Sequence, residues 1–232
     1  MWIKNNQPIN DNKPVSDSYM SPIEKRQSSG RPHKDDDVNR QRLILDTAVQ
    51  LYAKNGFEKV TFKGISAEAG VATSLIRHYF GSKEDFRATC SDYVISEVRV
   101  VFNNLKPTEN QVLGPDYLDS LGEGLIQQVR GRIHLLRYLA RLFLLGDRKA
   151  NQLFNEYYQM IKQITDQFDA AGMLHEKVSS VWVSFHFIFN QLGPVFLMDQ
   201  ISEQIAQDAY QQDVSKARTS TLVHIAKEGI FK

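Results

Sequence analysis

Hydrophobic residues recur every three or four positions along most of the chain, which is the spacing that places them on one face of an α-helix. The first such stretch predicts a helix over residues 38–55, whose inward stripe is formed by Ile44, Leu45, Ala48, Leu51 and Tyr52. The sequence has neither alternating strand patterns with hairpin turns nor a Gly-rich phosphate loop after a strand. We therefore predict an all-α protein.

Residues 1–36 lack this periodicity and contain Pro8, Pro14, Pro22 and Pro32 among many Asn, Ser and Asp residues. Such a segment buries too little apolar surface to offset the entropy lost on ordering. We expect a disordered N-terminal tail.

Two short helices are predicted next, over residues 62–69 and 72–80. Thr61 has the side chain of an N-cap for the first of them. Gly70 lies between the two and readily adopts positive φ. Ser82 opens a longer helix, to about residue 105, because Asp85 three positions later completes the spacing of a capping box.

The rest of the chain continues the helical pattern. The expected helices cover residues 116–129, 131–145, 148–171, 177–198 and 213–228. Polar residues interrupt the strongly apolar stretch 177–198, so we interpret it as a buried helix and not as a membrane span.

Two short helices around a glycine turn form a helix-turn-helix, which lays its second helix in the major groove of DNA. The outer face of the second helix carries Thr73, Ser74, Arg77 and His78, with Tyr79 near its edge. Lys63 and Lys83 lie in the first turns of the neighbouring helices, where cations and helix N-termini hold phosphates. The alternative is an ordinary helix pair, which is common in all-α domains.

Total charge gives little support for DNA binding, because 28 basic and 27 acidic residues leave a net charge of +1 and a pI of about 7.8. Residues 59–83, however, hold four basic residues and one acidic residue, a local charge of +3. Residues 31–34 add a basic segment that we interpret as a candidate DNA-contacting arm.

Residues 41–86 resemble the DNA-binding domain of the TetR family of bacterial transcriptional regulators. The matching motifs are Ile44-Leu45-Asp46-Thr47-Ala48, Leu51-Tyr52-Ala53, Asn55-Gly56-Phe57, Val60-Thr61-Phe62, Ile65-Ser66-Ala67-Glu68-Ala69-Gly70-Val71 and Tyr79-Phe80-Gly81-Ser82-Lys83-Glu84. The resemblance implies a DNA-binding domain over 37–85. It also implies a helical domain over 86–232 that dimerises and binds an effector.

The resemblance also implies roles for individual residues. It implies that Thr61, Lys63 and Lys83 contact DNA phosphates. The residues expected to face the major groove are Thr73, Ser74, Leu75, Arg77 and Tyr79. For His78, phosphate proximity or solvation competes with base contact. The sequence departs from the family pattern at Ala72, where a capping Ser is common and Thr73 is a possible substitute. It also departs at Arg77, where Tyr is common; Arg reads guanine bidentately or binds phosphate.

In the resembled family the last two long helices form the dimer interface, so we place it on 177–198 and 213–228, with a monomer core as the alternative. An effector pocket needs apolar walls and a few converging polar groups. The candidate effector-binding residues are Arg137, Tyr138, Arg141, Trp182 and His186, for each of which ordinary core or surface packing is the alternative.

Other classes of protein find little support in the sequence. The single cysteine, Cys90, forms neither an internal disulfide nor a cysteine-based zinc site, and it favours the reducing cytoplasm. Metalloprotease motifs, nucleophile elbows and spaced carboxylate pairs are absent, so we predict no enzyme, no metal and no cofactor. The expected function is a homodimeric, effector-responsive repressor on a palindromic DNA operator, without a membrane partner. An activator, or a helical interaction module that does not bind DNA, is the alternative.

Overall fold

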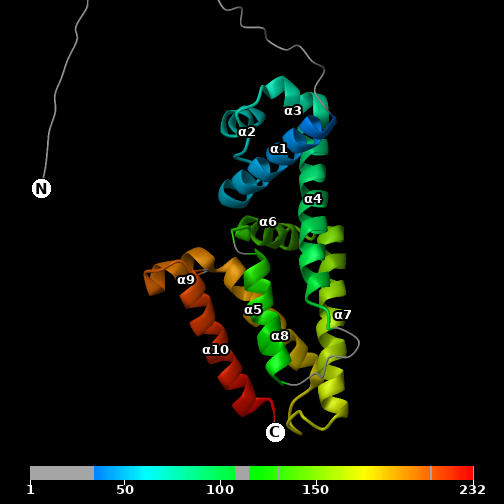
Figure 1. The fold of residues 1–232 in the computed structure, drawn as a ribbon, viewed down its shortest axis with the longest axis vertical. Coiled ribbons are helices and arrows are strands. Elements are labelled where there is room, and N and C mark those ends of the chain that lie inside the picture. The colour runs from blue at the N-terminus through cyan, green and yellow to red at the C-terminus, as the bar shows by residue number, and fades with distance from the viewer. Residues whose placement is uncertain (1–33, 108–114, 130, 210, 232) are drawn as a thin grey trace, which may run out of the picture.

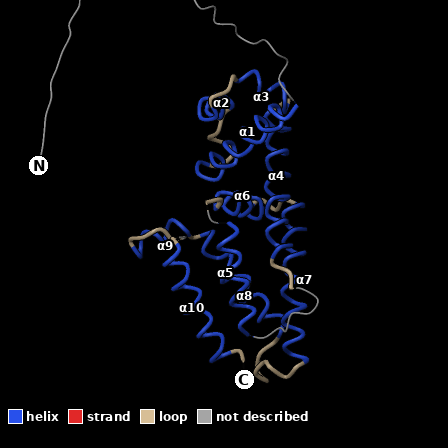
Figure 2. The backbone as a smooth tube through the Cα atoms, in the orientation of Figure 1, coloured by secondary structure: helices blue, strands red, loops and turns tan. Residues whose placement is uncertain are grey.

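The computed structural model describes residues 34–107, 115–129, 131–209 and 211–231, and nearly all of this backbone is helical (Figure 2). In these ranges the only β pairing is an isolated bridge between Leu174 and Phe231. The all-α prediction is confirmed. The helices are α1 Lys34–Asn55, α2 Phe62–Ala69, α3 Thr73–Phe80, α4 Lys83–Asn104, α5 Pro115–Val129, α6 Ile133–Leu144, α7 Arg148–Ala170, α8 Ser180–Phe196, α9 Met198–Ile205 and α10 Gln212–Gly229.

Helices α1, α2 and α3 form a small unit at one end of the elongated molecule (Figure 1). Its centre consists of residues with no solvent exposure, among them Ile44, Ala48, Tyr52, Ile65 and Ile76. The predicted stripe on the first helix therefore faces the core, with Leu45 and Leu51 partly buried at its margin.

The boundaries of the short helices follow from local chemistry. Thr61 caps α2, because its hydroxyl accepts a hydrogen bond of 3.1 Å from the Gly64 amide. Gly70 ends α2 in the left-handed region at φ +66°, where only a residue without Cβ is unstrained. Ser82 and Asp85 form both hydrogen bonds of a capping box at the start of α4. The hydrogen bonds from Ser82 lower the pKa of the Asp85 carboxyl.

Helix α4 runs from the small unit into the rest of the molecule, which contains α5 to α10 (Figure 1). Helix α6 lies crosswise under α1, so that it separates the small unit from the longer helices beneath. Helices α7 and α8 pack against each other, joined by a buried hydrogen bond of 2.7 Å between Thr165 and Ser184. This arrangement places α6 between the two ends of the molecule.

The two largest differences from the helix boundaries expected from the sequence lie at the start of α1 and in the stretch 177–198. Helix α1 begins at Lys34, so residues 34–36 are helical although we assigned them to the tail; the acidic residues there suit the positive end of a helix dipole. The tail residues 1–33, with most of the basic segment 31–34, lie outside the described residues.

The second difference concerns the stretch 177–198, which was expected to be one helix. The structure has a break near its end, where α8 stops and α9 begins. Helix α8 stops at Phe196 and α9 starts at Met198, with a bend of 79° between them. Pro194 lacks an amide proton and weakens the last turn of α8, which favours the break. In the described part of the chain no single helix is long and apolar enough to cross a membrane; α8 and α9 meet those criteria only as a bent pair.

Candidate nucleic-acid interface and ligand cavities

Helix α3 lies at the surface of the small unit with most of its polar side chains toward solvent. Ser74, Arg77 and His78 are exposed, whereas Thr73, Leu75 and Tyr79 are half-buried. The three residues expected to contact phosphate, which are Thr61, Lys63 and Lys83, are also exposed. The structure therefore presents the proposed contact residues at one end of the molecule, along α3 and near the starts of α2 and α4.

Thr73 joins α3 to α2 instead of capping its own helix. Its hydroxyl lies 2.8 Å from that of Ser66, which in turn donates to the Lys63 carbonyl at 3.0 Å. Because a serine hydroxyl has one proton, Thr73 is the donor of the first bond. The N-cap of α3 is Ala72, without a side-chain hydrogen bond, so the expectation that Thr73 replaces the missing cap is wrong.

Arg77 is exposed, but its guanidinium group is not free to adopt any position. The guanidinium carbon lies 5.5 Å from the centre of the Phe62 ring on α2, a cation–π distance. The ring thus supports the arginine from one side and leaves its remaining surface toward solvent.

Tyr79 turns toward α1. Its hydroxyl donates a hydrogen bond of 2.7 Å to Asp37, and this bond raises the pKa of Tyr79. With Thr73 bonded to α2 near one end and Tyr79 bonded to α1 near the other, α3 is held along its whole length. Groove contact by either side chain stays a prediction.

Two of the residues expected to bind an effector lie where the small unit meets α6. Tyr138 is fully buried and packs its ring against Tyr52 and Phe57, at centroid distances of 6.1 and 5.0 Å. Burial raises the pKa of its hydroxyl, which lies 3.2 Å from that of Ser91. Arg141 donates two hydrogen bonds to the Ala53 carbonyl at the end of α1, at 3.1 and 3.3 Å. Tyr138 therefore packs in the core between the two parts of the molecule.

The other three candidates are dispersed. Arg137 forms an ion pair with Asp199 of α9, and it lines a small cavity together with Arg141. Trp182 and His186 lie in the first half of α8, where Trp182 is 69% exposed and His186 forms a hydrogen bond of 2.8 Å with Asn190. The five candidates do not form a single site.

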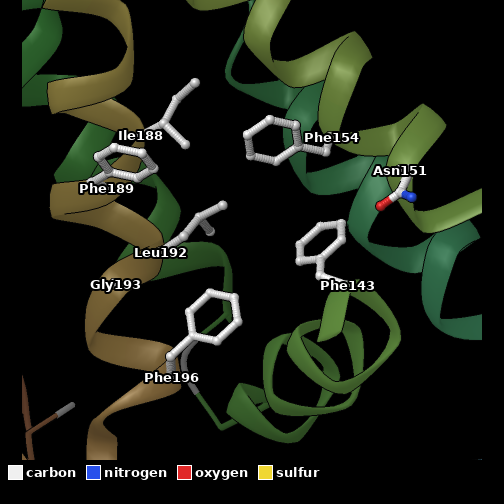
Figure 3. A pocket seen from close by; sticks show the side chains of 8 residues that line it. All are labelled: Phe143, Asn151, Phe154, Ile188, Phe189, Leu192, Gly193 and Phe196. Atoms are coloured by element: carbon white, nitrogen blue, oxygen red, sulfur yellow. The ribbon is translucent and has the colours of Figure 1, made fainter. Parts of the chain in front are cut away.

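A larger cavity of about 440 Å³ lies between α6, α7 and α8 (Figure 3). The aromatic and aliphatic side chains in Figure 3 point into it from three helices, and Asn151 supplies a polar group at its edge. Its walls are formed by Phe143, Asn151, Phe154, Ile188, Phe189, Leu192, Gly193 and Phe196. Sequence reasoning missed these residues, because periodicity marks an apolar face without telling a cavity wall from a packed core.

Metal-binding chemistry finds no support in the described ranges, where no three His, Cys, Asp or Glu side chains converge to hold an ion. Cys90 is buried in the core, and burial raises the pKa of its thiol, which disfavours the reactive thiolate.

Comparisons with known proteins point to a single family. The model of the bacterial regulatory proteins of the tetR family matches residues 44–89, which contain the helix-turn-helix. The HTH-type transcriptional regulatory protein RaaS of Mycobacterium tuberculosis is 26% identical over 140 residues, or 59% of this chain. The match covers 60% of the length of that curated relative.

Solved structures of regulators share the fold. The ketosteroid transcriptional regulator KstR2 of Mycobacterium tuberculosis has a TM-score of 0.63 at 14% identity, covering 84% of this chain and 95% of its own. A transcriptional regulator from Saccharomonospora viridis, solved in complex with choline, has a TM-score of 0.60 at 17% identity, covering 84% and 99%. These likenesses extend over the C-terminal helices as well as the helix-turn-helix.

Proposed function

We propose that this chain, which belongs to the TetR family of bacterial regulatory proteins, is a homodimeric transcriptional repressor that binds operator DNA and releases it when a small-molecule effector binds. The observation that carries this proposal is the exposed polar face of α3, with exposed Lys63 and Lys83 in the first turns of the flanking helices. The RaaS and KstR2 relatives bear the names of transcriptional regulators.

In this proposal α3 enters the major groove. Ser74 and Arg77 face the base edges, and Arg77 reads guanine through two hydrogen bonds. Lys63 and Lys83 neutralise phosphates beside helix N-termini, where backbone amides add to the attraction. The bonds of Thr73 and Tyr79 to neighbouring helices support this role, because a held α3 loses little entropy on binding.

Dimerisation is proposed through α8 and α10. The exposed side of α8 includes Trp182 and Phe189, at 69% and 58% exposure, and α10 exposes Ile225 at 56%. On α8 the Phe185 ring lies next to those of Trp182 and Phe189, and apolar side chains that gather on a surface mark an interaction site. A two-fold dimer would present two α3 helices to successive major grooves, about 34 Å apart.

The effector is proposed to bind in the C-terminal helices, in the cavity between α6, α7 and α8. A ligand that prefers one spacing of the two α3 helices shifts the population toward that spacing. The choline complex of the Saccharomonospora viridis protein supports the proposal that this fold accommodates a small molecule.

Selection of binding sites from random DNA tests the DNA-binding part. A palindromic consensus is the expected result, since each half-site would meet one copy of α3. A consensus without two-fold symmetry would contradict the dimeric arrangement, and the absence of salt-dependent DNA affinity would favour a helical interaction module instead.

Variants then separate base reading from phosphate binding. On the selected operator, Arg77→Ala should cost about 1–3 kcal/mol, with little effect on a scrambled duplex. Lys83→Ala should weaken both duplexes alike and reduce the salt dependence, whereas Lys106→Ala, an exposed lysine after α4, serves as the control. Equal losses on both duplexes for Arg77→Ala would assign that arginine to phosphate.

A further inference from the structure

The cavity proposed above for the effector is almost entirely apolar. Four phenylalanines, with Ile188 and Leu192, form most of its wall, and the Asn151 amide is its one side chain with a hydrogen-bonding group. At about 440 Å³ it lies in the size range of pockets for small organic ligands. An occupant of this space needs an apolar body.

A second, smaller cavity of about 170 Å³ has the opposite character. It lies where the end of α1 meets α6 and the junction of α8 and α9, and its charged residues are Lys54, Arg137, Arg141 and Asp199. Three cations and one carboxylate leave a formal charge of +2 around it. Such a cavity favours an anion.

The carboxylate already present there, that of Asp199, forms only a weak ion pair. Asp199 pairs with Arg137, but its side chain is 82% exposed. Ion pairs of exposed groups contribute little free energy, because water competes for both partners. An incoming ligand anion can therefore replace Asp199 at Arg137, while Arg141 stays bonded to the Ala53 carbonyl.

The two cavities adjoin. Between them lies a narrow space of about 10 Å³, which shares Phe143, Leu192 and Phe196 with the apolar cavity. It shares Ala140, Val195 and Phe196 with the basic one. Phe196 is the residue common to all three, and it is 41% exposed, so it is not fully enclosed by the protein.

We propose that these two cavities form one binding site for an amphiphilic organic anion, with Phe196 as the gate between its parts. The apolar body fills the space between α6, α7 and α8, and the carboxylate pairs with Arg137 beside Lys54. The regulatory consequence of this site rests on the proposed effector response. The binding site itself stands on the two cavities and their shared wall.

The position of the anionic group gives the site a regulatory consequence. Lys54 belongs to the last turn of α1, whereas Arg137 belongs to α6. An anion between them contacts the DNA-binding unit and the C-terminal helices at once. Ligand binding is thereby coupled to the angle between α1 and α6, and through α1 to α3.

Isothermal titration calorimetry with three probes tests the proposal on the full chain. Dodecanoate, below its critical micelle concentration, should bind one molecule per chain. Dodecan-1-ol has the same apolar body without the charge and should bind at least about tenfold more weakly, since hydrogen bonds to charged groups are the stronger ones. Acetate, the charge without the body, should bind more weakly still.

Variants assign the anionic group. Arg137→Ala should lower the affinity for dodecanoate by about tenfold or more and leave that for dodecan-1-ol unchanged. Arg99→Ala is the matched control, because this exposed arginine also pairs across helices, with Glu156 at 2.9 Å, but lies outside both cavities. Phe196→Ala should raise the association rate of dodecanoate if that ring is the gate.

Equal affinities for dodecanoate and dodecan-1-ol, or an Arg137→Ala variant that binds dodecanoate normally, would overturn the proposal. Gel shifts without any of the three probes test DNA binding separately from ligand binding, so the two proposals can fail independently. DNA binding without dodecanoate binding would refute this inference alone. Dodecanoate binding by a protein without DNA affinity would refute the proposed repressor function and leave the site in place.

Discussion

Tyr79 of α3 donates a hydrogen bond of 2.7 Å to Asp37 in the first turns of α1, across 42 positions of sequence. The bond connects the proposed recognition helix to the start of the first described helix. Asp37 also lies 4.0 Å from Arg40 on the same helix. The orientation of α3 therefore depends on α1 as well as on α2.

Replacement of this hydroxyl should lower stability. We expect Tyr79→Phe to lower the free energy of unfolding, because the hydrogen bond to Asp37 is lost. Urea unfolding of Tyr79→Phe, Asp37→Ala and the double variant measures their coupling. Strictly additive losses would show that the pair does not interact in solution, and the tyrosine hydroxyl would then be available for DNA.

The capping box at the start of α4 gives a second prediction. Ser82→Ala should cost about 1 kcal/mol, because a backbone amide at the helix start loses its acceptor. Ser96→Ala is the control, because the exposed Ser96 hydroxyl bonds the Tyr93 carbonyl within α4 and caps no helix. Chemical unfolding measures both, and equal small losses would contradict a capping role.

The Asp85 carboxylate in that box predicts how stability responds to acid. Its pKa is lowered in the folded protein from the ordinary value of 3.8. The folded state thus binds fewer protons than the unfolded state, and its contribution is fully present above pH 3.8 and lost as the pH falls through the lowered pKa. The stability difference between the natural chain and Asp85→Asn should shrink below pH 3.8, as followed by circular dichroism.

Another pair of variants addresses the proposed dimer. Trp182→Glu should convert the dimer to monomer, because it places a charge in the apolar contact of α8. Val100→Glu is a matched control, since Val100 is 58% exposed on α4, outside the proposed interface. Sedimentation velocity distinguishes dimer from monomer. If Trp182→Glu dimerises with unchanged affinity, the interface does not include this part of α8.

His186 predicts a stability change nearer neutral pH. Burial lowers its pKa from the ordinary 6.5, and the Asn190 amide nitrogen, which can only donate, lies 2.8 Å from its Nε2. The folded state therefore prefers the neutral ring, and stability should fall as the pH drops through 6.5. His186→Gln should flatten this dependence in thermal unfolding at fixed protein concentration. An unchanged slope would exclude His186 as its source.

The sequence by itself determined the local features. The caps at Thr61 and Ser82, the left-handed turn at Gly70 and the stripe through Ile44 and Tyr52 all depend on residues within a few positions of one another. Such signals lie within one helix or one turn, so the pattern of residues suffices to find them. The fold class and the helix-turn-helix followed from them.

Only the tertiary structure decided which faces of different helices meet. Periodicity placed Tyr138 and Trp182 on helices, but it did not reveal that the first is buried against α1 and the second exposed on α8. The walls of the apolar cavity come from three helices whose residues are as much as 53 positions apart, from Phe143 to Phe196. Hydrophobic burial is non-directional, so a sequence specifies that these side chains leave water and the packing of the helices decides what they surround.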